Sequence, residues 1–228
     1  MRRYLFILSL LTSLLLCGAF NAIAAPGDFL FEFGDDYRFT NPSGIAVDGS
    51  GNIYVADTDN HRVQVFSPTG VFLRKWGDNG SGNGQFSYPS GIAVDGSGNV
   101  YVADTTNNRI QVFTSAGTFL GKWGTQGTAD GQFSYPRGIA VDGSGNVYVA
   151  DTTNNRIQVF TDTGVFLRLW GTPGTGDGQF NTPTGVAVDG IGNVYVVDSN
   201  NHRIQVFTTT GTFVRKWGVL GSGDGQLK

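Results

Sequence analysis

The stretch that decides the fold is PSGIAVDGSGNVYVADTTNNRIQVF, residues 89–113. It holds three short apolar segments, Ile92–Val94, Val100–Ala103 and Arg109–Phe113, which are separated by clusters of glycine, asparagine, aspartate and threonine. Glycine and asparagine tolerate the positive φ of tight turns, so the stretch predicts antiparallel strands joined by hairpins. A fourth segment, Phe119–Trp123, follows another glycine turn, and no helical period is found after the first 24 residues.

This four-strand pattern occurs four times with a period of 47 residues and without insertions. The stretches 84–114 and 131–161 are nearly identical and differ only at Ser90 and Arg137. Three positions mark the repeat: Pro42, Pro89, Pro136 and Pro183; Asp57, Asp104, Asp151 and Asp198; and Trp76, Trp123, Trp170 and Trp217.

The second strand of each unit is apolar on both faces. In the second copy Val100 and Val102 point to one side of the strand, and Tyr101 and Ala103 point to the other. Burial on both faces indicates sheets that are stacked between neighbouring sheets. The sequence therefore predicts an all-β fold, a β-propeller with four complete four-stranded blades at about residues 39–77, 86–124, 133–171 and 180–218.

The unit Pro-x-Gly-Ile-Ala-Val-Asp-Gly-x-Gly-Asn-x-Tyr-Val-x-Asp, followed after four residues by Arg-Ile-Gln-Val-Phe, resembles the NHL repeat. The segments 60–63 and 201–204 carry its Asn-His-basic-aliphatic stretch most clearly. The resemblance implies a propeller of the NHL type. Such propellers are known as protein-binding modules, RNA-binding modules, sensor domains of receptor kinases and one metal-dependent lyase, so the fold does not select a function.

Partial units stand at both ends of the repeat array. Phe29–Gly34 resembles an isolated fourth strand, and Gly223–Leu227 begins a fifth unit. NHL propellers usually have more than four blades, so we expect an incomplete arc of a larger propeller. A fragment of a longer product, closure by pairing with another chain and an unusually small ring are the alternatives. An open arc exposes apolar blade faces, which predicts self-association through its open edges.

Residues 1–24 have the pattern of a secretory signal peptide. Two arginines precede the apolar run Tyr4–Leu16, and Ala22 and Ala24 fit cleavage after residue 24. Retention as a membrane anchor and lipidation at Cys17 are the alternatives. Cleavage would leave a propeller at 25–228 that is secreted or periplasmic, with no transmembrane span and no cysteine.

The charge balance argues against nucleic acid as a partner. The whole chain has a formal net charge of −3, and removal of Arg2 and Arg3 with the signal peptide would make the mature chain more acidic. No basic run remains to neutralise a phosphate backbone. Of the functions implied by the NHL resemblance, RNA binding is therefore the least favoured.

The sequence predicts no catalytic residue, no metal site and no cofactor. After residue 24 it holds two histidines, His61 and His202, one glutamate, Glu32, and no cysteine, too few ligands for zinc. The turn Asp-Gly-Ser-Gly-Asn at Asp48 and at two later positions is similar to a calcium loop, but the fourth copy has Ile191 where a ligand would be needed. We interpret this turn as a hairpin.

An aspartate and an arginine recur at a fixed spacing in every copy. We interpret them as ion pairs that hold the turn between the second and third strands, because a specific site should break the symmetry. The alternative is a ring of binding residues. The pairs are Asp57/Arg62, Asp104/Arg109, Asp151/Arg156 and Asp198/Arg203.

A binding site should lie where the copies differ on exposed loops. Arg137 is the one charged residue at its repeat position, and Tyr88 and Tyr135 are aromatic at the position before the repeated proline. Arginine and tyrosine are favoured interface anchors, so we hypothesise that these residues, with His61 and His202, form a recognition patch. Neutral drift on a solvated rim is the alternative.

The function predicted from the sequence is that of an exported, non-catalytic binding or scaffold module. The predicted ligand is another protein, with a peptide or glycan as alternatives. The competing function is a metal-dependent lyase or hydrolase of propeller architecture.

Overall fold

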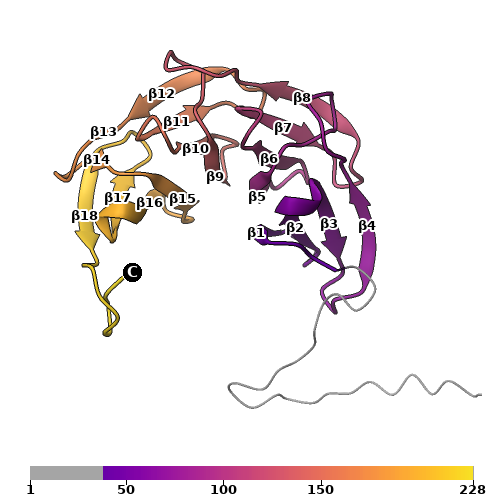
Figure 1. The fold of residues 1–228 in the computed structure, drawn as a ribbon, viewed down its shortest axis with the longest axis horizontal. Coiled ribbons are helices and arrows are strands. Elements are labelled where there is room, and N and C mark those ends of the chain that lie inside the picture. The colour runs from indigo at the N-terminus through magenta and orange to yellow at the C-terminus, as the bar shows by residue number, and fades with distance from the viewer. Residues whose placement is uncertain (1–37, 228) are drawn as a thin grey trace, which may run out of the picture. The chain divides into compact units, whose positions relative to one another are not determined.

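The structure is a computed structural model and describes residues 38–227. It contains four sheets of four antiparallel strands, and each sheet is one repeat (Figure 1). In every blade the strands pair in chain order. This confirms the predicted all-β propeller with four complete blades. The predicted signal peptide and the strand-like segment Phe29–Gly34 lie outside the described residues.

The strand bounds repeat from blade to blade. The first blade contains β1 (Pro42–Val47), β2 (Ile53–Asp57), β3 (Arg62–Phe66) and β4 (Phe72–Trp76). The second contains β5 (Pro89–Val94), β6 (Val100–Asp104), β7 (Arg109–Phe113) and β8 (Phe119–Trp123). The third contains β9 (Pro136–Val141), β10 (Val147–Asp151), β11 (Arg156–Phe160) and β12 (Phe166–Trp170). The fourth contains β15 (Pro183–Val188), β16 (Asn193–Asp198), β17 (Arg203–Thr208) and β18 (Phe213–Trp217).

Short elements occur between these strands. Two 3₁₀ turns, η1 (Thr58–Asn60) and η2 (Ser199–Asn201), join the second and third strands of the first and fourth blades. The link between the third and fourth blades contains the two-residue strands β13 (Thr172–Pro173) and β14 (Gln179–Phe180). Figure 1 shows the blades side by side in an arc, with β1, β5, β9 and β15 on the inner side.

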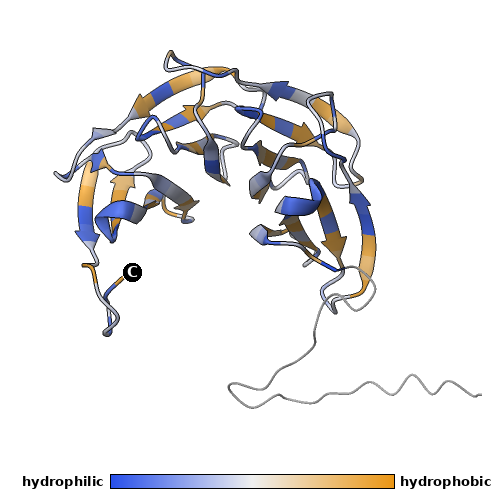
Figure 2. Ribbon diagram, viewed as in Figure 1, coloured by the Kyte–Doolittle hydropathy of each residue, from blue (hydrophilic) through white to orange (hydrophobic). Residues whose placement is uncertain are grey.

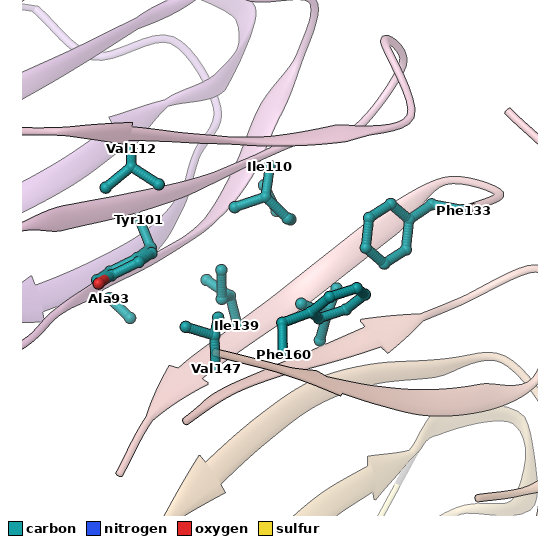
Figure 3. Close-up of a cluster of buried hydrophobic side chains, with 10 residues drawn as sticks. Ala93, Tyr101, Ile110, Val112, Phe133, Ile139, Val147 and Phe160 are labelled. Atoms are coloured by element: carbon teal, nitrogen blue, oxygen red, sulfur yellow. The ribbon is translucent and has the colours of Figure 1, made fainter. Parts of the chain in front are cut away.

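The blades pack through apolar faces, as the two-sided pattern predicts. Val100 and Val102 join a buried cluster shared with the first blade, whereas Tyr101 and Ala103 join the cluster shared with the third. Figure 3 shows the latter cluster, in which Phe160 and its neighbours face the second blade. In Figure 2 the apolar residues lie along the strands of all four blades, and the connecting turns are mostly polar.

The Asp-Gly-Ser-Gly-Asn segment forms a hairpin turn between the first two strands of the first three blades, and Asp-Gly-Ile-Gly-Asn forms the equivalent turn in the fourth. Asp48 Oδ1 accepts hydrogen bonds from the backbone N–H groups of Ser50 and Asn52, and Oδ2 accepts from the Asn52 amide and the Tyr54 hydroxyl. Gly51 has a φ of 82°, which explains the glycine. The oxygens that suggested a calcium loop are therefore engaged within the turn.

These hydrogen bonds favour the ionised aspartates. Burial opposes ionisation at Asp48 and Asp142, but hydrogen bonds from the following asparagine and tyrosine outweigh it and lower the pKa of both carboxyl groups. At Asp189 the bonds from Asn193 lower the pKa to about 2. Burial and the bond to Asp142 raise the pKa of Tyr148 to about 12, so its hydroxyl remains a donor.

The hairpin turns should make the fold sensitive to acid. The folded-state pKa of these aspartates lies below the unfolded value, so their contribution to stability is complete at neutral pH and is lost as pH falls through the folded pKa. We expect the thermal unfolding midpoint to fall as pH is lowered from about 4 to about 2. Asp189→Asn should fall less steeply than the wild type, and parallel curves would contradict this explanation.

Candidate binding site in a cavity between the blades

The recurring aspartate is the centre of a buried polar network in every blade. Asp104 is fully buried, and one of its oxygens accepts a hydrogen bond of 2.7 Å from Arg109 Nε. It also accepts from the side chains of Asn107 and Gln111 and from the backbone N–H of Ser87 in the link before the blade. A buried carboxylate needs such compensation. The network therefore supports a structural function for these pairs.

The arginine of each pair ties the blade to the link that precedes it. Arg109 donates to the backbone carbonyls of Ser81, Gly82 and Gln85. Arg156 and Arg203 make the same three contacts in their blades. These contacts fix the end of each link, and the residue just before the repeated proline lies there.

The variable positions of the links meet around one cavity. It has a volume of about 760 Å³ and lies between the inner strands and the loops after β2 and β6. Tyr88, Tyr135 and Arg137 all line it, so the structure brings together three of the five residues proposed from the sequence. All three side chains are exposed, and the tyrosines are 49% and 47% accessible.

Both tyrosines have left-handed backbone conformations. Tyr88 and Tyr135 have φ values of 52° and 53°, and the equivalent residues Asn41 and Thr182 have 53° and 58°. Asparagine accepts this region readily, whereas tyrosine and threonine do not, and a following proline disfavours it further. Strain of this kind occurs preferentially at functional sites. The two tyrosines therefore occupy positions where local backbone stability alone would favour another residue.

Each strained residue is held by a side chain of the preceding blade. The Tyr88 N–H donates to His61 Nδ1 at 3.1 Å, and the rings of these residues pack edge to face with centroids 4.7 Å apart. The Tyr135 N–H donates to Asn108 Oδ1 and the Thr182 N–H to Asn155 Oδ1, both at 2.8 Å. His61 thus holds Tyr88 in place at the cavity but does not line the cavity itself.

His202 has a different environment from the other proposed residues. It occupies the position equivalent to His61 but belongs to the fourth blade, where it lines a separate depression with Lys216, Trp217 and Leu220. The structure therefore does not bring His202 to the cavity that contains Arg137.

Arg137 interrupts a series of paired hydroxyl groups along the cavity. Ser90 and Thr105 are 2.7 Å apart, and equivalent pairs form between Ser43 and Thr58 and between Thr184 and Ser199. In the third blade Arg137 replaces the first hydroxyl, while Thr152 still donates to the Pro183 carbonyl. Among the lining residues that the structure describes, Arg137 is the one cation and Asp59 the one anion.

Sequence reasoning missed part of this cavity. Its wall includes Thr58 and Thr105, whose hydroxyls pair with the variable positions, and its floor includes Ile92 and Ile139 from β5 and β9. The threonines directly follow the repeated aspartates, and this fixed position was the available signal. Ile92 and Ile139 gave no such signal, because an apolar residue in these strands is equally expected in the core of a blade.

Two kinds of feature are absent from the described residues. Within residues 38–227 there is no group of three or more histidine, cysteine or carboxylate side chains arranged to bind a metal ion. In the same part of the chain no helix is long and apolar enough to cross a membrane.

Comparison with known proteins identifies the repeat. The NHL repeat family model matches residues 39–66, 86–113, 133–160 and 180–207. The chain is an NHL-repeat protein. Each match begins three residues before the first strand and extends through nearly all or all of the third strand, so it includes the repeated aspartate, its arginine and the hairpin turn.

Relatives of this NHL chain match it over short stretches. It is 60% identical over 42 residues to the B-box type zinc finger protein ncl-1 of Caenorhabditis elegans, a match to 18% of this chain and 5% of that protein. It is 46% identical over 55 residues to Protein brain tumor of Drosophila melanogaster, 24% of this chain and 5% of that protein. The matched stretch thus spans a small part of these relatives.

Solved structures show the same fold. Virginiamycin B lyase from Staphylococcus aureus superposes with a TM-score of 0.61 and 19% identity, over 81% of this chain and 57% of the lyase. At this identity the likeness shows the propeller architecture alone.

The strain at the tyrosines predicts a gain in stability on their removal. Tyr135→Asn places the residue found at Asn41 in the same backbone conformation, and we expect it to raise the free energy of unfolding by about 1 kcal/mol. Tyr88→Asn should gain less, because it also loses the ring contact with His61. Chemical denaturation measures both changes. A destabilised Tyr135→Asn would show that this tyrosine is kept for packing.

Proposed function

We propose that this protein is an exported binding module that recognises a protein partner through the cavity lined by Tyr88, Tyr135 and Arg137. One observation carries the proposal. Tyr88 and Tyr135 occupy strained backbone positions, and both line the cavity, where Arg137 is the only positively charged residue among the described lining residues. Exposed aromatic and arginine side chains in a concave site are typical of binding surfaces.

The chemistry of the cavity favours an extended peptide segment with an acidic group. Arg137 has no ion pair with any of the residues 38–227, and its guanidinium is exposed. A guanidinium binds a carboxylate through two parallel hydrogen bonds. The tyrosines supply rigid apolar area, and the hydroxyls of the wall supply hydrogen-bond partners for a peptide backbone. A glycan with an acidic group is the alternative ligand.

Peptide display tests this proposal with variants taken from the repeats themselves. A random peptide library is selected on the immobilised mature chain, and the affinity of the enriched peptides is measured by calorimetry. Arg137→Ser reproduces Ser43 and Ser90, and Tyr135→Asn reproduces Asn41, so both preserve the local fold. Each should weaken binding about tenfold or more, ~1.4 kcal/mol.

Two results would contradict the peptide-binding function. Enriched peptides that bind the Arg137→Ser, Tyr135→Asn double variant as tightly as the wild type would place recognition elsewhere. Stoichiometric zinc in the purified chain would instead support the alternative of a metal-dependent lyase, which at present has the likeness of fold in its favour.

Export is part of the proposal and rests on the residue pattern of the N-terminus. A cleaved signal at residues 1–24 would deliver the propeller to the periplasm or the exterior. We expect the intact mass of the protein recovered from outside the cytoplasm to correspond to a chain that begins at Ala25. A cytoplasmic protein that retains Met1–Ala24 would contradict export.

A further inference from the structure

The interface between the second and third blades lacks a side chain that the other two interfaces of the described arc share. Arg74 Nε of the first blade donates to the Ser115 carbonyl of the second at 2.8 Å. Arg168 Nε of the third blade donates to the Thr209 carbonyl of the fourth at 2.9 Å. The equivalent residue of the second blade is Gly121. Glycine has no side chain that could donate this bond to the third blade.

A cavity lies where that side chain would be. It has a volume of about 270 Å³, and its lining includes Tyr101, Val112, Gly121 and Trp123. A Cβ atom added to Gly121 would meet no atom within 4 Å apart from its chain neighbours. Val112, which pairs with Gly121, is 6% exposed, whereas the equivalent valines of the first and third blades are fully buried. The cavity is therefore open to solvent, and it suits a group the size of a side chain.

The third blade adds a negative charge to the same cavity. Asp162 lines it, and the Asp162 carbonyl stands at the position of the two carbonyls that accept from an arginine. The equivalent residues of the other blades carry no charge; they are Pro68, Ser115 and Thr209. The Asp162 side chain is exposed and forms no ion pair with any of residues 38–227. Compared with its two counterparts, this interface has lost a cation and gained an anion.

The tyrosine of the cavity reflects this change of charge. The Tyr101 hydroxyl donates to Asp95 Oδ2 at 3.0 Å. Burial, this bond and the charges of Asp95 and Asp162 all raise the pKa of Tyr101. At the equivalent Tyr148 the neighbouring Arg168 acts in the opposite direction and lowers the pKa. The surroundings of Tyr101 are therefore more negative than those of its counterpart in the third blade.

Lys122 also lines the cavity but does not replace the arginine. The side chains of β8 alternate between half-buried and exposed, and Lys122 belongs to the exposed set. Position 121 shares the side of Trp123, which packs on Phe160 of the third blade. In the first blade a lysine, Lys75, occupies the position of Lys122 and directly follows Arg74. A lysine at this position thus occurs together with the arginine and does not substitute for it.

We propose that this cavity binds a guanidinium group that comes from outside the chain. The two counterpart interfaces hold a guanidinium of the chain itself against the carbonyl of the next blade. Here the Asp162 carboxylate can accept two parallel hydrogen bonds from a guanidinium, and Tyr101 and Trp123 offer aromatic surface to a planar cation. An ammonium group lacks the planar fork and uses only part of this arrangement.

This site is separate from the one in the proposed function. Its lining shares no residue with the cavity that contains Arg137. The two cavities also differ in the charge that they offer, because a cation lines the first among hydroxyl groups, whereas the second has an unpaired carboxylate beside aromatic rings.

Two sources supply a guanidinium of this kind, a small alkylguanidine and the arginine side chain of another protein. The probes are therefore butylguanidinium and arginine blocked at both ends as N-acetyl-arginine methylamide. Each is titrated into the ¹⁵N-labelled protein, and NMR shifts are followed. We expect the amide signals of Gly121 and Asp162 and the indole signal of Trp123 to shift and saturate. Binding of both probes indicates an arginine side chain as ligand, and binding of butylguanidinium alone indicates a small molecule.

Variants taken from the repeats test the assignment. Gly121→Arg restores the residue found at positions 74, 168 and 215, and it should abolish the shifts because its own guanidinium occupies the cavity. Asp162→Thr reproduces Thr209 and should weaken binding about tenfold, through loss of the charge-assisted hydrogen bonds. Asp130→Asn is the matched control: it removes the same charge outside the cavity, reproduces Asn83 and should bind like the wild type.

Three results would overturn the proposal. They are shifts that do not saturate, butylammonium that binds as tightly as butylguanidinium, and a folded Gly121→Arg or Asp162→Thr variant that binds like the wild type. Peptide affinity of Gly121→Arg separates this proposal from the proposed function. Position 121 does not line the cavity that contains Arg137, so that cavity should bind peptide whether or not the guanidinium site is blocked.

Discussion

The structure depends on a buried carboxylate that appears once in every blade. Asp57, Asp104, Asp151 and Asp198 are fully buried, and each accepts a hydrogen bond of 2.7 Å from an arginine. An isolated buried charge is strongly unfavourable, so removing any one donor would leave a cost that the remaining partners cannot offset. Because the partners come from the blade and from the link before it, the network makes each link part of the next blade. Hydrophobic packing between blades supplies most of the stabilisation, but it is this network that fixes where each link ends.

The same network shapes the proposed binding surface as a consequence of the fold. A link that is fixed by the arginine and the aspartate turns through a left-handed residue before it enters the inner strand. The backbone N–H of that residue donates a hydrogen bond to a side chain of the preceding blade, either His61 or an asparagine such as Asn108, and this bond positions it beside the cavity. The backbone conformation is thus imposed by the repeat, whereas the side chain at that position is free to vary. Recognition can then change from copy to copy without disturbing the carboxylate network, and stability and function are divided between different residues of one unit.

The fold could be predicted from the sequence because every position of the repeat occurs in four copies, which can be compared with one another. The two-sided apolar pattern of Val100–Ala103 predicted packing on both neighbours, and the fixed spacing of Asp104 and Arg109 predicted their pairing. Sequence reasoning also singled out Tyr88, Tyr135 and Arg137 as residues that differ between copies. It could not place them around one cavity, because that depends on the curvature of the arc.

Two other properties of the candidate site could not be predicted from residue patterns. The positive φ of Tyr88 was not expected, because tyrosine before proline normally indicates extended backbone. The function of His61 as a hydrogen-bond acceptor for a backbone N–H was equally hidden, since Asn108 performs it with a different side chain. Both arise from contacts between blades, and these contacts depend on how the blades pack and not on the order of residues within one.

Near-identity of the copies has a physical consequence beyond the ease of recognising them. If every interface between blades is chemically the same, a blade discriminates between its own neighbour and the blade of another molecule only through covalent linkage, which sets a high effective concentration. Within residues 38–227 the two middle blades are covered on both sides by their neighbours in the chain, and Trp170 and Val188 are packed against such a shared cluster. A repeat array that is stabilised by uniform interfaces therefore depends on the connectivity of the chain, and not on the chemistry of each interface, to keep its blades in order.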